Sequence, residues 1–88
     1  MEMIELVKNQ MQLIQWVGRP PRPTDIARWE RAAIAALGNL SCALVTAQEK
    51  GGDPRRIAPI LRQLSEWREV ATRLKGFGRP RALKMLES

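Results

Sequence analysis

Glycine and proline gather at two points of this 88-residue chain, and the long stretches between them carry apolar residues at helical spacing. The runs Gly18-Arg19-Pro20-Pro21-Arg22-Pro23 and Gly51-Gly52-Asp53-Pro54 both combine residues that end helices. No segment alternates apolar and polar residues as a half-buried strand does. The sequence therefore predicts an all-α protein with three main helices, at about residues 2–17, 24–50 and 54–75.

The first predicted helix is apolar on two adjacent sides. One stripe follows steps of three and four and consists of Ile4, Val7, Met11 and Ile14. A second stripe beside it is interrupted only by Gln10 and consists of Met3, Leu6, Leu13 and Val17. A helix of this kind needs cover from more than one neighbouring helix.

The second predicted helix is long and rich in small residues. Thr24 is a natural N-cap, and Gly51-Gly52 predicts a left-handed end after residue 50. A helix over 24–50 would be about 40 Å long at a rise of 1.5 Å per residue. Gly38 lowers helix propensity by about 1 kcal/mol relative to alanine. We expect close packing of another helix to offset that cost.

The third predicted helix begins at a capping Asp53 followed by proline. Pro59 predicts either a kink or a true start near Ala58. Gly76 is expected to end the helix, with Phe77 folding back on the Leu74 turn. The tail, residues 76–88, is either a short fourth helix or frayed and flexible, within a single domain that spans residues 1–88.

The composition argues against catalysis and metal binding. The chain has no histidine, no nucleophile–base combination, no glycine-rich phosphate loop and no cluster of metal ligands. Its single cysteine, Cys42, lies among apolar residues and is expected to be a buried free thiol. We therefore expect no enzyme activity, no catalytic residue, no cofactor and no metal. The acidic start and the lack of a long apolar run favour a cytoplasmic protein without membrane contact.

The charge is the unusual quantity of this sequence. Fifteen basic residues stand against nine acidic ones, which gives a net charge of +6. Positive charge gathers in the 18–23 connector and after residue 53, which favours an acidic partner. A high-GC genome that inflates arginine usage is the alternative explanation.

Two short motifs suggest nucleic acid but match it incompletely. Gly18-Arg19-Pro20 and Gly78-Arg79-Pro80 resemble half of an AT-hook, although the preceding arginine is replaced by Val17 and Phe77. Helix termination explains both copies. The junction before Arg55 and Arg56 approaches a helix-turn-helix, but the helix before it is too long for that motif.

The predicted function is that of a non-enzymatic regulatory or adaptor protein that inhibits or tethers a partner protein with an acidic surface. The candidate partner-binding residues are Arg19, Arg22, Arg55, Arg56, Arg62 and Arg68, with Trp29 or Trp67 as an anchor if either is exposed. A small basic DNA- or RNA-binding protein is the alternative. The apolar sides of residues 2–17 and 24–50 further predict a helical-bundle homodimer. In size and general sequence character, though in no motif, the chain resembles small helical proteins of bacteriophages and mobile elements.

Overall fold

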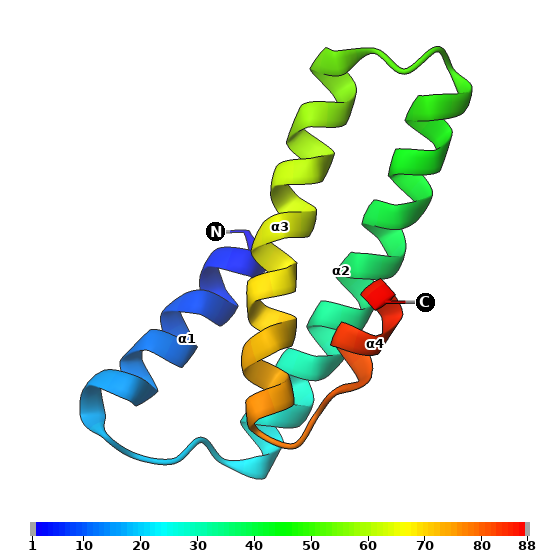
Figure 1. Ribbon diagram of the computed structural model, residues 1–88. Helices are drawn as coiled ribbons and strands as arrows, with labels where there is room; N and C mark the ends of the chain where they lie inside the picture. Colours follow the sequence, from blue (N-terminus) through cyan, green and yellow to red (C-terminus); the bar gives the residue numbers. More distant parts are fainter. Residues whose placement is uncertain (1, 88) are drawn as a thin grey trace.

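The computed structural model describes residues 2–87, and in this part of the chain helices are joined by short loops (Figure 1). α1 spans Met3–Val17, α2 spans Pro23–Glu49, α3 spans Pro54–Gly76 and α4 spans Arg81–Glu87. No strand occurs among these residues. The all-α prediction is confirmed, and the three predicted main helices agree with α1, α2 and α3 to within one residue at either end. No helix among residues 2–87 has the length and apolar character needed to cross a bilayer.

The starts of α2 and α3 show what proline contributes. The N-cap of α2 is Arg22, in extended conformation, and not the predicted Thr24, which lies inside the helix. The difference arises because Pro23 supplies a preset helical φ and needs no N–H partner at the first position. α3 begins as predicted, with the side chain of Asp53 accepting a hydrogen bond from the Arg55 N–H at 3.0 Å.

The end of α2 has the predicted left-handed form. Gly52 N–H donates to the Ala47 carbonyl at 3.0 Å, and Gly51 N–H donates to the Gln48 carbonyl at 3.3 Å. These two bonds define a Schellman turn.

The end of α3 differs from the prediction by two residues. Gly76 is still helical, and the residue with left-handed φ is Gly78. Arg79 N–H donates to the Leu74 carbonyl at 2.8 Å, and Gly78 N–H donates to the Lys75 carbonyl at 3.0 Å. The Schellman turn therefore places Arg79, and not Phe77, over the last turn of the helix.

α3 runs through Pro59 without interruption, so the predicted later start near Ala58 is wrong. Two other local predictions also fail. Cys42 is exposed, and a side-chain carbon placed on Gly38 would meet no atom within 4 Å, so no helix approaches closely there.

α2 and α3 form an antiparallel hairpin, and α1 and α4 lie against one half of it (Figure 1). We call residues 23–39 and 65–76 the proximal half of the hairpin and residues 40–64 its distal half. The main core lies in the proximal half and consists of Ile4, Val7, Met11, Trp29, Ala33, Leu37, Trp67, Val70, Ala71, Leu74 and Ala82. In the distal half Ala47 is the one described residue that is fully buried.

One hydrogen bond and one ion pair fasten the outer helices to α2. The Trp29 indole N–H donates to the Gln10 side-chain oxygen at 2.7 Å, which accounts for the polar residue in the second stripe of α1. Arg79 contacts the buried carboxylate of Glu30 at 3.4 Å. Of the two states predicted for the tail, the structure has the helical one, because residues 81–87 form α4 with Ala82 fully buried.

The molecule is elongated and thin, with extents of 47 × 26 × 15 Å. Its radius of gyration is 14.1 Å, against about 12 Å for a compact domain of this length. Its accessible surface is 6342 Å², against about 5,200 Å² for a compact monomer of this mass. The chain therefore leaves roughly 1,100 Å² more surface exposed than a compact fold would.

Candidate functional site

A cleft opens where α1 separates from α3. In Figure 1 the start of α1 lies beside the middle of α3, whereas its last turns lie well away from the end of α3. Gly18, with left-handed φ, ends α1 by donating its N–H to the Ile14 carbonyl at 3.0 Å. The proline-rich connector then returns the chain to α2, so the C-terminal half of α1 is held apart from α3.

The larger part of this opening is an apolar hollow of about 710 Å³. Its walls come from α1, the connector and the end of α3, and its lining residues are Met11, Ile14, Gln15, Gly18, Arg19, Pro20, Pro21, Arg73, Gly76 and Phe77. Two arginines, Arg19 and Arg73, belong to the lining, and no acidic residue does. The hollow thus joins an apolar surface to uncompensated positive charge.

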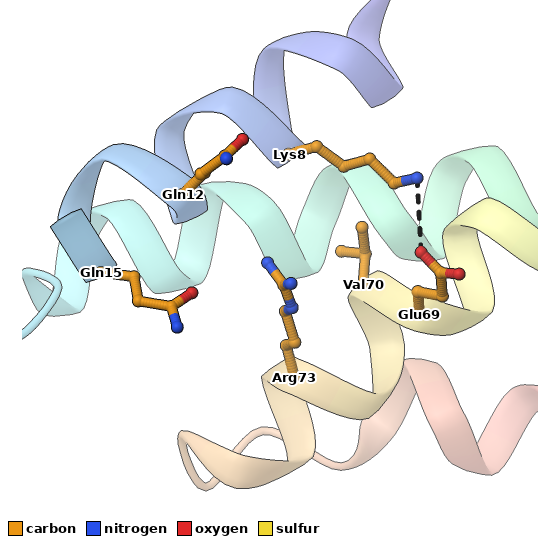
Figure 2. Close-up of a pocket in the computed structure, with 6 residues that line it drawn as sticks. All are labelled: Lys8, Gln12, Gln15, Glu69, Val70 and Arg73. Atoms are coloured by element: carbon orange, nitrogen blue, oxygen red, sulfur yellow. Dashed lines mark ion pairs between the residues drawn. The ribbon is translucent and has the colours of Figure 1, made fainter.

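A smaller polar hollow of about 250 Å³ continues the opening along α1 and α3, and Figure 2 shows the residues that line it. Lys8 and Glu69 form an ion pair across it at 3.3 Å. Exposed pairs of this kind contribute at most about 1 kcal/mol. Gln15 and Arg73 line both hollows, so we treat the two together and call them the α1–α3 cleft.

Arg73 is the central charge of the cleft. Its side chain extends from α3 toward α1 in Figure 2. Glu69 lies four residues before Arg73, a spacing at which ion pairs can form along a helix, but Glu69 contacts Lys8 instead. Among residues 2–87 no carboxylate lies within ion-pair distance of Arg73. Its guanidinium donors are therefore not engaged by any carboxylate of the described chain.

The predicted arginines are spread over the molecule, and the structure places one of them, Arg19, in the cleft. Arg22 is exposed in the connector, and Arg55 and Arg56 lie in the first turn of α3. Eighteen residues of helix separate Arg55 from Arg73, which corresponds to about 27 Å.

Arg62 and Arg68 lie on different sides of α3. Arg62 lines a hollow that also contains Glu2, Glu5, Lys8 and Glu66, so acidic residues offset its charge. Arg62 and Glu66 are four residues apart on α3, but they form no ion pair within 4.0 Å in the described chain. Residues 62, 66, 69 and 73 share the side facing α1, and Arg68 falls outside this series of three- and four-residue steps.

The exposure of the tryptophans differs from the prediction that Trp29 or Trp67 could be an exposed anchor. Trp29 is 1% exposed and Trp67 is 3% exposed, so both are core residues and neither can anchor a partner. Trp16, at the end of α1, is 87% exposed. Tryptophan is rarely so exposed, because burying its ring is strongly favourable.

Sequence reasoning missed Glu30, which is buried at 4% exposure. One oxygen of its carboxylate contacts Arg79, and the other has no hydrogen-bond partner. The sequence carried a signal, because Ile26, Glu30, Ala33 and Leu37 follow steps of four, three and four along the buried side of α2. Arg79 lies between α3 and α4, outside the helices, yet its charge is used at the core, because its partner is this buried carboxylate.

Within residues 2–87 no group of three or more potential ligands is placed to hold a metal ion. The cleft instead combines an apolar lining with two arginines, an arrangement suited to binding. Comparison with protein families, with curated proteins and with solved structures finds no match to this chain.

Proposed function

We propose that this protein is a non-enzymatic binding module that inhibits or tethers a partner protein by holding an acidic segment of that partner in the α1–α3 cleft. The observation that carries the proposal is the pairing of Arg19 and Arg73 over one apolar hollow of about 710 Å³ that contains no carboxylate. Such a module would inhibit its partner by covering the bound segment, or would tether the partner by keeping that segment close to this protein.

The size and lining of the hollow define the segment that fits it. Its volume lies in the range of about 300–1,000 Å³ that is typical of sites for small ligands. One or two large apolar side chains can enter such a space, whereas a folded surface cannot. A carboxylate beside those side chains would meet the guanidinium of Arg19 or Arg73. Charge-assisted bonds of this kind are stronger where water is partly excluded.

A nucleic-acid partner is less well supported by the distribution of charge. Phosphate binding draws on basic residues gathered on one face. Here Arg55 and Arg56 lie at one end of the hairpin, Arg62 is accompanied by carboxylates, and Arg68 lies on another side of α3. The alternative is therefore retained as an outcome of the binding experiment.

The experiment selects peptides from a random displayed library against the immobilised chain. We expect enrichment of peptides that combine acidic residues with one or two large apolar residues. Replacing Arg19 and Arg73 together with serine should weaken the selected peptides by about tenfold or more, because two charge-assisted contacts of roughly 1 kcal/mol are lost.

The matched control replaces Arg55 and Arg56 with serine, which removes the same charge at the far end of α3. Affinity should then change by no more than about twofold. Equal loss in both variants would mean that net charge, and not the cleft, determines binding. Binding of a random-sequence DNA duplex tighter than about 10⁻⁴ M at physiological salt would favour the nucleic-acid alternative.

We also propose that the protein is a homodimer. A standard interface buries about 800 Å² of each partner. The roughly 1,100 Å² by which this chain exceeds the surface of a compact monomer leaves room for an interface of that size.

A further inference from the structure

Between residues 6 and 16, the side of α1 that points away from the hairpin is mostly apolar and carries no charged side chain. Leu6, Asn9, Leu13 and Trp16 follow steps of three, four and three, and all are exposed. Val17 extends this surface, which we call the α1 outer face. Four of the exposed large hydrophobic residues of the described chain belong to it: Leu6, Leu13, Trp16 and Val17. The second stripe thus lacks the further neighbour that the sequence led us to expect.

We infer that two copies of this chain meet through the α1 outer face, with their α1 helices antiparallel across a two-fold axis. The inference rests on the homodimer proposed above and names its surface. In such an isologous interface each copy offers the same patch, and each contact occurs twice.

Charge favours a second copy on this face and also sets its direction. Two molecules of net charge +6 repel each other over most of their surfaces. The α1 outer face lacks charge, and Glu2 and Glu5 lie at its start. The connector at its end carries Arg22. An antiparallel pair brings the acidic start of each α1 toward the basic connector of the other copy, whereas a parallel pair places like charges together.

The packing of the face also suits a second copy. A shallow hollow of about 230 Å³ is lined by Asn9, Gln12, Leu13 and Trp16. With Leu13 at the two-fold axis, Trp16 of one copy lies over Asn9 and Gln12 of the second copy. Its ring gains cover, and its indole N–H meets side-chain amides that can accept a hydrogen bond.

The rival surface is the exposed side of α2, where Ala35, Gly38, Cys42 and Val45 follow the same three- and four-residue spacing. Small side chains bury little area, and no aromatic residue lies among them. Interface energy concentrates on large anchors, tryptophan above all. The α1 outer face is therefore the stronger candidate for self-association.

The first test measures dimer dissociation by sedimentation equilibrium of the full chain. We expect a species of about twice 10.0 kDa for the unchanged protein. Leu13→Lys should raise the dissociation constant by about 30-fold or more, as expected for a residue at the centre of an interface. The matched control is Leu61→Lys, because Leu61 is similarly exposed, 50% against 63%, but lies in the distal half. Its dissociation constant should stay within about twofold.

A monomer of 10.0 kDa at micromolar concentrations would overturn the inference, as would equal disruption by Leu61→Lys. Cys42 gives a second measurement that needs no substitution. Its thiol is exposed on the rival surface of α2. Its rate of reaction with a maleimide should be the same in monomer and dimer, and a slower rate in the dimer would place α2 in the interface instead.

The proposed dimer and the proposed peptide binding in the cleft can be refuted independently of each other. Replacing Arg73 alone with serine should weaken peptide binding and leave dimerisation unchanged, because Arg73 lies on α3, outside both the α1 outer face and the connector. A monomeric protein that still binds acidic peptides would refute the dimer and its surface alone. A dimer that dissociates on Leu13→Lys but binds no such peptide would support the surface and refute the cleft.

Discussion

The proximal and distal halves of the α2–α3 hairpin are built from similar amphipathic helix but differ in what covers them. In the proximal half, α1 and α4 add their own apolar residues, and Trp29, Leu37, Val70 and Leu74 are fully buried. In the distal half, Leu44, Ile57 and Ile60 remain half-buried because two helices alone enclose little volume. Apolar periodicity predicts helices equally well in both halves, but burial depends on the number of helices that meet at each point.

The comparison predicts the largest change in the free energy of unfolding for substitutions in the core. Leu37→Ala in the proximal half should lower the free energy of unfolding by about 2–5 kcal/mol, because it removes buried methyl groups and leaves a cavity. Leu44→Ala in the distal half should lower it by roughly 1 kcal/mol, because the side chain is already part-exposed. Urea unfolding followed by circular dichroism measures both. Equal losses would mean that the distal half is covered in solution.

The next effect concerns the ion pair that holds α4 against the proximal half. Arg79→Ala should lower the free energy of unfolding by about 2–3 kcal/mol, because Glu30 is left as a buried carboxylate without a partner. The value falls below the range for fully buried pairs, since the Arg79 side chain is 43% exposed. Arg81→Ala is the matched control, two residues away and exposed, and should change stability by less than about 0.5 kcal/mol. Similar losses in the two variants would exclude a special role for the pair.

The smallest effect lies at the boundary between the halves. Gly38→Ala should raise the free energy of unfolding by about 0.5–1 kcal/mol, because alanine favours the helix and its side-chain carbon meets no atom within 4 Å. Gly52→Ala should instead destabilise, because Gly52 has a left-handed φ of +68°. Thermal unfolding of the two variants checks the signs. A loss of stability in Gly38→Ala would reveal a close contact at this position.

The parts of this structure that could be predicted from sequence are those set by neighbouring residues. The three- and four-residue spacing of Ile4, Val7 and Met11 fixes both a helix and its buried side. Asp53 followed by Pro54 fixes the start of α3. The shift of the α3 end from Gly76 to Gly78 shows the limit of such reasoning, because two glycines compete and either could adopt the left-handed conformation.

The parts that could not be predicted depend on which segments meet in space. Trp16 and Trp29 both lie in helices beside apolar residues, yet the first is 87% exposed and the second 1% exposed. Glu69 lies four residues before Arg73 but pairs with Lys8, because α1 brings Lys8 to that carboxylate. The cleft itself arises from the angle at which the connector holds α1, and a residue pattern within one helix does not encode that angle.

The Schellman turn at the end of α3 has a consequence for changes of chain length. The backbone N–H groups of Gly78 and Arg79 donate hydrogen bonds to the last turn of α3. These bonds fix the position of Arg79, which contacts Glu30, relative to that turn. A single residue inserted after Phe77 would carry Arg79 past its partner while α3 stayed intact. The α3–α4 junction is therefore sensitive to insertions and deletions, even where its exposed side chains tolerate substitution.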